Sequence, residues 1–114
     1  KEYVRIVKDR GQGGKIINIA STAGLGARPG RSAYAASKAA VINFSLSMSE
    51  ELKPYGIKVY CIAPGACATD MRRIIAPDDD FKTMMQPHEL ARFVVDIAEH
   101  GDMLDGQVIQ ARGR

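Results

Sequence analysis

The stretch from Lys15 to Lys38, KIINIASTAGLGARPGRSAYAASK, decides the fold class of this protein. It begins with a β-branched apolar run, continues through a loop of small residues and glycines, and ends in an alanine-rich helical pattern. A short apolar run that is bounded by turn residues is typical of a strand covered on both faces. The stretch therefore predicts a strand, a loop and a helix, in that order.

The rest of the chain continues this alternation of strands and helices. Strands are expected over residues 15–20, 57–63 and 106–112, and helices over 2–10, from about Ser32 to Lys53, and from Pro87 to about His100. We expect residues 66–85 to be irregular, with Asp78–Asp80 capping a short turn. Alternation of this kind implies a parallel sheet with right-handed crossovers, so the predicted fold class is α/β with three strands.

Composition excludes several classes of protein. The 114 residues carry a net charge of +3, but the basic residues are scattered and aromatic residues make up only 6%, so a nucleic-acid interface is not favoured. No apolar run approaches the length of a membrane span. Cys61 and Cys67 fit neither a disulfide framework nor a zinc spacing, and buried reduced thiols are expected.

The glycines at 24–30 raise the question of a phosphate-binding loop. A dinucleotide-binding turn needs glycine at its first, third and sixth positions. Counting from Gly24, the third position is Gly26 but the sixth is Pro29, and Gly30 comes one residue too late. We therefore interpret these glycines as residues that let a surface loop turn.

The ends of this stretch are better candidates for chemistry. Tyr34 and Lys38 stand four apart near the start of a predicted helix, so they share one face. Ser21 follows the first strand and Pro64 with Gly65 follows the second, at the edge where open parallel sheets bind ligands. Taken singly, Ser21 is explained as a turn cap and the Tyr34–Lys38 pair as a solvated helix pair.

In combination, GKIINIAS, YAASK and APGACATDM resemble the short-chain dehydrogenase/reductase family, and the thirteen positions from Ser21 to Tyr34 agree with it. The resemblance implies the C-terminal portion of a doubly wound, Rossmann-like sheet, so that residues 1–114 form a single partial domain. It implies an NAD- or NADP-dependent oxidoreductase that interconverts a carbonyl and an alcohol. The family's glycine-rich cofactor turn and its catalytic asparagine have no counterpart among these residues.

The resemblance also implies roles for individual residues. Tyr34 would exchange the proton, Lys38 would support it and bind the nicotinamide ribose, and Ser21 would hold the substrate oxygen. The residues expected around the cofactor are Tyr34, Lys38, Pro64, Gly65, Ala66, Cys67 and Thr69. Thr69 with Asp70 is explained equally well as a helix cap. No metal site is expected, because no partner ligands are spaced around Asp78–Asp80.

Further expectations concern partners and the alternative function. The apolar residues between Thr69 and Pro87 favour a hydrophobic or acyl-type carbonyl substrate. The family resemblance implies a homo-oligomer, a dimer or tetramer, with a cytoplasmic location as the default. The alternative is a non-catalytic fragment that keeps only packing and subunit-contact surfaces. Because 15–20 would form an apolar edge strand, we expect the isolated 114 residues to be poorly soluble or not uniquely folded.

Overall fold

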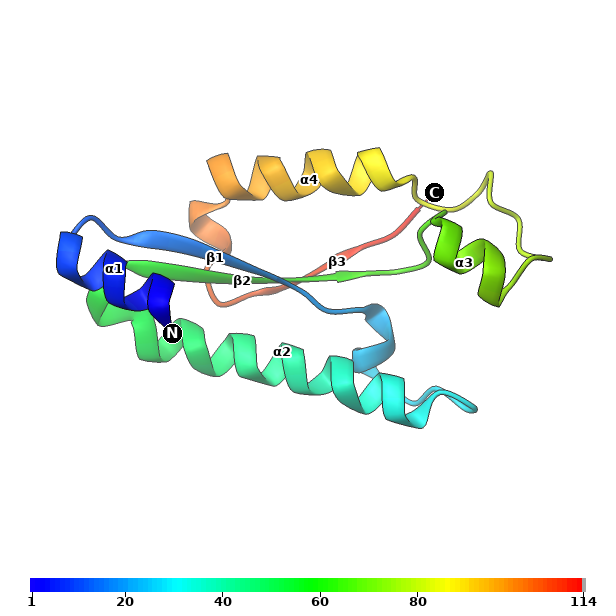
Figure 1. The fold of residues 1–114 in the computed structure, drawn as a ribbon, viewed down its shortest axis with the longest axis horizontal. Helices are drawn as coiled ribbons and strands as arrows, with labels where there is room; N and C mark the ends of the chain where they lie inside the picture. The colour runs from blue at the N-terminus through cyan, green and yellow to red at the C-terminus, as the bar shows by residue number, and fades with distance from the viewer. Residues whose placement is uncertain (114) are drawn as a thin grey trace.

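The computed structural model, which describes residues 1–113, is a three-stranded parallel sheet with helices on both faces (Figure 1). The strands are β1 (Gly14–Ile19), β2 (Ile57–Pro64) and β3 (Val108–Ala111). The helices are α1 (Glu2–Arg10), α2 (Ser32–Leu52), α3 (Asp70–Ile75) and α4 (Pro87–His100), with short 3₁₀ turns η1 (Thr22–Leu25), η2 (Lys53–Tyr55) and η3 (Asp102–Leu104). The predicted α/β class and element order are confirmed, and the last strand is shorter than expected.

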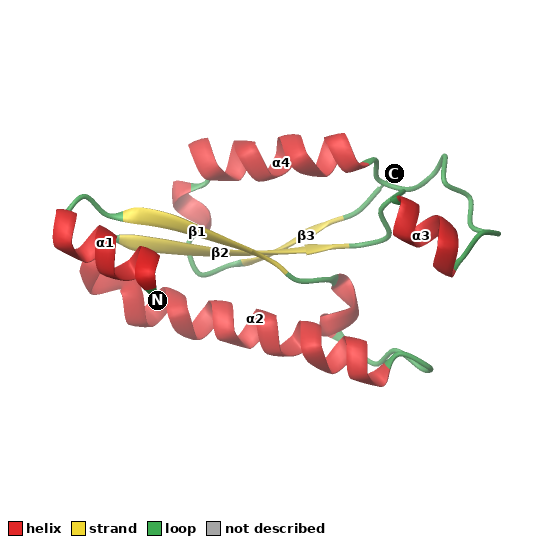
Figure 2. Cartoon of the chain, viewed as in Figure 1, coloured by secondary structure: helices red, strands yellow, loops and turns green. Residues whose placement is uncertain are grey.

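The strands lie in the order β1-β2-β3, and both neighbouring pairs are parallel. Parallel strands place all their carboxyl ends at one edge of the sheet. The loop after β1, the start of α2, the loop after β2 and α3 all lie at that edge (Figure 2). We call it the carboxyl edge, and it is where the sequence places the candidate site.

Strand β2 is the centre of the core because it is covered on both faces. Its alternate residues Val59 and Cys61 pack toward α1 and α2, whereas Tyr60 and Ile62 pack toward α4. All four side chains are buried. Successive side chains of a strand point to opposite faces of the sheet, so each helical layer packs against one alternate set.

Strand β1 corrects one expectation. The sequence predicted a strand covered on both faces, but the residues of β1 are only half-buried and Ile19 is 43% exposed. Within the part of the chain that the structure describes, β1 pairs with β2 alone. Among the described residues the apolar run is also an edge strand, as the sequence led us to expect, and its other side pairs with no described strand.

Residues 66–85 correct a second expectation, because this segment is not wholly irregular. Asp70–Ile75 form a short helix, α3, whose N-cap is Thr69. The Thr69 side chain accepts a hydrogen bond from the Arg72 backbone N–H at 3.2 Å. The turn predicted at Asp80 is confirmed, since its carboxylate accepts from the Lys82 backbone N–H at 3.0 Å.

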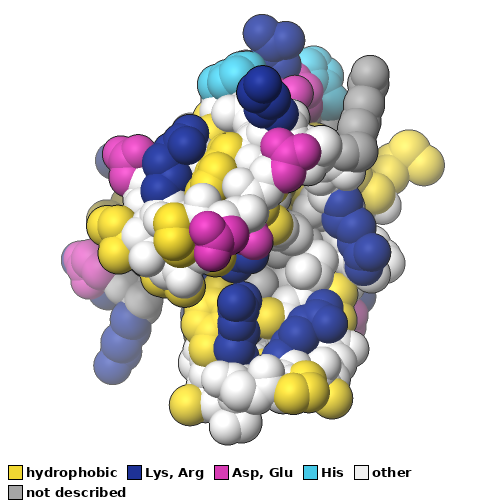
Figure 3. Space-filling model, turned by 90° about the vertical axis from the view of Figure 1, so that its right-hand side faces the viewer, with side chains coloured by type: hydrophobic (Ala, Val, Ile, Leu, Met, Phe, Trp, Pro, Cys, Tyr) yellow, Lys and Arg dark blue, Asp and Glu magenta, His cyan; other side chains and the backbone are white. Residues whose placement is uncertain are grey.

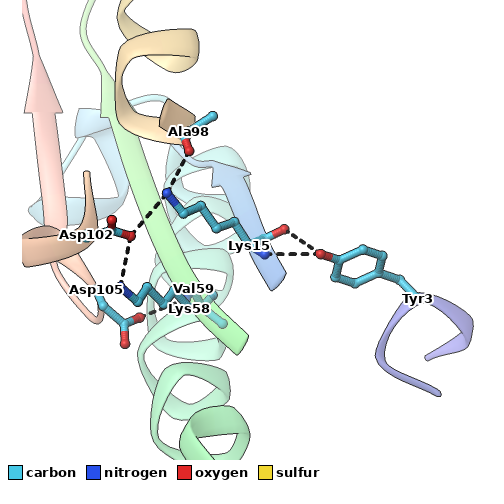
Figure 4. A network of polar contacts seen from close by, with 7 residues as sticks. All are labelled: Tyr3, Lys15, Lys58, Val59, Ala98, Asp102 and Asp105. Atoms are coloured by element: carbon cyan, nitrogen blue, oxygen red, sulfur yellow. Dashed lines mark hydrogen bonds and ion pairs between the residues drawn. The ribbon is translucent and has the colours of Figure 1, made fainter. Parts of the chain in front are cut away.

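A network of charged groups ties the opposite, amino edge of the sheet together (Figure 4). Lys15 and Lys58 are register partners on β1 and β2, and Asp102 Oδ1 contacts both ammonium groups, at 3.1 and 2.8 Å. Lys15 Nζ also donates to the Ala98 carbonyl near the end of α4 at 2.7 Å. The ammonium groups of Lys58 and Lys15 hold the pKa of the Asp102 carboxyl below its ordinary value.

The hydroxyl of Tyr3 connects α1 to the backbone of β1. It donates to the Lys15 carbonyl at 3.1 Å and accepts from the Lys15 N–H at 3.0 Å (Figure 4). One side chain thus satisfies both backbone polar groups of Lys15.

None of the helices described for residues 1–113 combines the length and the apolar character that a membrane span requires. Within the same residues, no group of three or more His, Cys, Asp or Glu side chains is arranged to hold a metal ion.

Candidate functional site

The first component of the site is the turn that follows β1. Ser21 is the N-cap of η1, and its Oγ accepts a hydrogen bond from the Ala23 backbone N–H at 3.1 Å. The capping explanation of Ser21 is therefore observed. A serine hydroxyl has a second lone pair and one proton besides, so Ser21 can still donate to a ligand.

Gly24 presses this turn against α2. A Cβ atom built on Gly24 lies 2.6 Å from the Lys38 carbonyl carbon and 2.7 Å from the Ala39 nitrogen. Only a residue without a side chain can approach a helix backbone this closely. The turn carrying Ser21 therefore lies directly on the part of α2 that carries Lys38.

This contact corrects the interpretation that the glycines at 24–30 serve only to let a loop turn. Gly30 does so, with φ of +73°, but Gly24 is required for packing. The packing role of Gly24 was not predicted, because a glycine that turns the chain cannot be distinguished in sequence from one that permits a close approach. The nearby Tyr34 and Lys38 motif was the one signal that the helix beside Gly24 matters for function.

Tyr34 and Lys38 lie on α2 as the spacing predicts. The Lys38 Nζ atom is 5.8 Å from the centroid of the Tyr34 ring. Tyr34 is 48% exposed, and Lys38 is half-buried. Within residues 1–113, neither the Tyr34 hydroxyl nor the Lys38 ammonium has a hydrogen-bond partner, so both are available to a ligand.

The loop after β2 is the third component. The Gly65 N–H donates to the Ala111 carbonyl at 2.7 Å, and the Ala68 N–H donates to the Met85 carbonyl at 2.9 Å. These bonds hold the segment Pro64–Thr69 between the end of β3 and the residues before α4. The capping role of Thr69, described above, is likewise built into this segment.

Cys67 is half-buried in this loop and has no disulfide partner. Burial raises the pKa of the Cys67 thiol, although a hydrogen bond with the Ala68 backbone opposes the change. The thiol is therefore protonated at neutral pH and is a poor nucleophile. Cys61 lies in the core, where burial also raises its pKa.

Two arginines organise the segment that follows α3. Arg72 Nε donates to Asp79 Oδ2 at 2.6 Å, and the Arg73 guanidinium lies 4.4 Å from the centroid of the Phe81 ring. By contrast, Met71, Ile74 and Ile75 on α3 are 68%, 82% and 62% exposed. The segment is thus fixed through its polar side chains and presents apolar ones outward. Sequence reasoning noted the apolar residues but not these contacts.

Most of the residues at the carboxyl edge lie in a region that matches a known protein family. The family model described as short chain dehydrogenase matches residues 1–80, which include Ser21, Tyr34, Lys38 and Thr69. The chain belongs to the short-chain dehydrogenase family. The resemblance drawn from the sequence motifs is confirmed.

Among curated proteins, this short-chain dehydrogenase chain is 36% identical to the 3-oxoacyl-(acyl-carrier-protein) reductase FabG of Chlamydia trachomatis, over 91% of this chain and 46% of that protein. It is also 36% identical to 3-hydroxyacyl-CoA dehydrogenase type-2 of Rattus norvegicus, over 90% of this chain and 42% of that protein. The chain spans less than half the length of the curated relatives it matches.

Solved structures of family members share the fold. A gluconate 5-dehydrogenase from Burkholderia cenocepacia, in complex with NADP and tartrate, matches with a TM-score of 0.80 and 32% identity, over 94% of this chain and 46% of that one. A 4-hydroxyisoleucine dehydrogenase complexed with NADH matches with a TM-score of 0.82 and 28% identity, over 98% and 50%. The parallel sheet with its helical layers is therefore the C-terminal portion of the Rossmann-like fold of these enzymes.

Proposed function

We propose that residues 1–114 are a partial domain, the catalytic portion of an NAD(P)-dependent oxidoreductase that interconverts a carbonyl and an alcohol. One observation carries this proposal. The close approach of Gly24 to Lys38 holds the Ser21 turn against the helix that presents Tyr34 and Lys38, at the carboxyl edge of a parallel sheet. A hydroxyl, a phenol and an ammonium, all with free hydrogen-bonding capacity, are the groups that carbonyl reduction requires.

Tyr34 is the proposed proton donor to the carbonyl oxygen. A nearby ammonium stabilises the phenolate that remains after proton transfer. Lys38 is one helical turn from Tyr34 and is the ammonium placed to do this. Ser21 donates its hydroxyl proton to the substrate oxygen and fixes its position, while its Oγ stays bound to the Ala23 N–H.

The residues present fit the nicotinamide half of the cofactor. The free ammonium of Lys38 and the hydroxyl of Tyr34 suit the ribose hydroxyls, and the anchored loop offers Pro64, Gly65, Ala66, Cys67 and Thr69 beside the ring. When bound, NAD or NADP supplies or accepts the hydride. Rigid backbone bonds at Gly65 and Ala68 keep this loop in place for that role.

The substrate class and the oligomeric state are also proposed. The exposed side chains of Met71, Ile74 and Ile75 beside the site favour a hydrophobic, acyl-type carbonyl compound, and two relatives are named for acyl thioesters. A homo-oligomer, a dimer or tetramer, is proposed from membership of the family. A cytoplasmic location follows the family default.

Tyr34→Phe in the full-length gene product tests the proposed chemistry. We expect turnover to fall by about 10²–10⁴-fold, because the ring is kept and only the proton donor is lost. The matched control is Tyr55→Phe, since Tyr55 is 43% exposed at the other end of α2.

Both variants should keep the wild-type thermal unfolding curve. Equal turnover in Tyr34→Phe and wild type would rule out this tyrosine as the proton donor. Loss of turnover in Tyr55→Phe would show that the assay reports folding rather than chemistry.

A further inference from the structure

We propose that the substrate of this site carries an anionic group, a carboxylate or a phosphate, and that Arg28 and Arg31 recognise it. The inference rests on the proposed function and specifies its substrate class. Both arginines lie in the loop between η1 and α2, which links Ser21 to Tyr34.

The segment between Asp9 and Glu50, which carries the candidate catalytic residues, has positive charges and no negative ones. Its cations are Arg10, Lys15, Arg28, Arg31 and Lys38. Of these, Lys15 is neutralised by Asp102 at the amino edge of the sheet. Arg28, Arg31 and Lys38 have no acidic neighbour in sequence, and the carboxylates of this edge belong to another segment, which includes Asp70 and Asp78–Asp80. The loop between η1 and α2 therefore carries positive charge only.

The contacts of Arg28 and Arg31 attach their loop to the segments that carry Ser21 and Tyr34. The Arg28 guanidinium donates to the carbonyl of Thr22, the residue after Ser21, at 3.4 Å. The Arg31 N–H donates to the Arg28 carbonyl at 3.0 Å, and the Arg31 carbonyl accepts from the Ala35 N–H at 2.9 Å. The loop is thereby attached to η1 on one side and to α2, three residues before Tyr34, on the other.

Other arginines at this edge are already engaged. Arg72 is paired with the Asp79 carboxylate, and Arg73 lies over the Phe81 ring. Arg28 and Arg31 are exposed and have no carboxylate partner among residues 1–113. Figure 3 looks onto this end of the molecule, where Lys and Arg side chains lie in the lower part and Asp and Glu side chains lie among other Lys and Arg side chains above them.

A guanidinium presents several donors in a planar fork that matches a carboxylate or a phosphate. Arg28 uses one nitrogen for Thr22, which leaves the others free. An anion held by this pair orients the substrate with its carbonyl toward Ser21 and Tyr34. Arginines on an exposed loop are often simply solvated, and the comparison of matched substrates below separates the two cases.

The test compares two substrate pairs whose members differ in one anionic group. Acetoacetate against methyl acetoacetate tests a carboxylate, and acetoacetyl-4′-phosphopantetheine against acetoacetyl-pantetheine tests a phosphate. The full-length wild type is compared with Arg28→Gln/Arg31→Gln, and with Arg10→Gln as a control for loss of a remote exposed arginine at the end of α1.

We expect the double variant to lower kcat/KM for the charged member of at least one pair by about 10–100-fold, with the neutral member changed by less than about two-fold. A response of the first pair assigns a small acid, and a response of the second assigns a phosphate-bearing carrier. Equal loss for charged and neutral members, or no loss, overturns the proposal. In that case turnover that still depends on Tyr34 leaves the proposed function intact.

If wild type reduces none of the four compounds, the proposed function fails for them, and binding decides the anion site. Calorimetric titration of wild type and the double variant with 3-hydroxybutyrate and with inorganic pyrophosphate provides that readout. Binding by wild type that the double variant loses supports the site. No binding by wild type overturns it.

Discussion

The two edges of the sheet use positive charge in opposite ways. At the amino edge, Lys15 and Lys58 both contact Asp102, and Lys15 also donates to the end of α4. At the carboxyl edge, Lys38 and Arg28 contact no carboxylate among residues 1–113. The amino edge thus pairs Lys15 and Lys58 internally, whereas the carboxyl edge leaves Lys38 and Arg28 available although Arg72 is paired there with Asp79.

This difference indicates which edge stabilises and which edge binds. Like charges directly opposite one another on neighbouring strands destabilise a sheet, and Asp102 relieves that repulsion between Lys15 and Lys58. An unpaired exposed cation contributes little to folding but can meet a ligand. Changes at the amino edge should therefore alter stability, and changes at the carboxyl edge should alter turnover unless they disturb packing.

The largest effect is expected where the carboxyl edge depends on packing, at Gly24. In Gly24→Ala the new Cβ atom meets the α2 backbone at 2.6 Å, so η1 must move away from Lys38. We expect a loss of about 1–3 kcal/mol in the free energy of unfolding, as for overpacked sites, together with reduced turnover. Urea titration and steady-state kinetics measure the two effects.

Gly26→Ala is the matched control for this change. Gly26 is extended, with φ of −178°, and a Cβ atom built there has no neighbour within 4 Å. The variant should resemble wild type. Equal behaviour of the two alanine variants would contradict the packing role of Gly24.

A smaller effect is expected at the amino edge from Asp102→Asn. The variant keeps the size of the side chain but removes the charge that holds Lys58 and Lys15, so its Tm should fall. Asp96→Asn on the exposed side of α4 is the control, and its Tm should stay at the wild-type value.

The same carboxylate gives a pH dependence of defined sign. The pKa of Asp102 is lower in the folded state than its ordinary value of 3.8, chiefly through Lys58. Its contribution is therefore complete above that value and is lost as the pH falls through the lowered folded-state pKa. The difference in Tm between wild type and Asp102→Asn should shrink in that acidic range. A difference that stays constant down to the acid limit would contradict the ion pair.

The smallest effect on stability is expected from Lys38→Met. The ammonium has no hydrogen-bond partner within the described residues, so the free energy of unfolding should change by no more than about 0.5 kcal/mol. Turnover should nevertheless fall, because Tyr34 loses its neighbouring charge. A large loss of stability would show that Lys38 has a structural partner, and the contrast between the two edges would weaken.

Much of the fold could be predicted because its signals are local. The β-branched run in β1, the proline at the start of α4 and the apolar run of β2 each indicate one element. The edge position of β1 was predicted, but the half-exposure of its residues was not, because an apolar run looks the same whether its faces are fully or only partly covered. Helix α3 was missed because six residues give too short a pattern to recognise.

For the candidate site, the motifs located Ser21, Tyr34 and Lys38 at one edge of the sheet. Gly24 sets the turn that carries Ser21 against α2, and its role depends on a contact with Lys38, fourteen positions away. The pairing of Arg72 with Asp79 depends on how a loop folds back, which periodicity does not encode. Composition and spacing thus indicate which groups are present, and the packing of the loop indicates which of them meet.

The Tyr3 hydroxyl has a consequence for which chains can add to this sheet. The N–H groups of Gly14 and Ala20 bond toward β2, so by alternation Lys15, Ile17 and Ile19 direct their backbone groups to the opposite side of β1. Tyr3 already occupies both groups of Lys15. A neighbouring strand can therefore pair freely only along Ile17–Ile19, unless it displaces Tyr3. The phenol of Tyr3 thus limits the addition of another strand at the Lys15 position of β1.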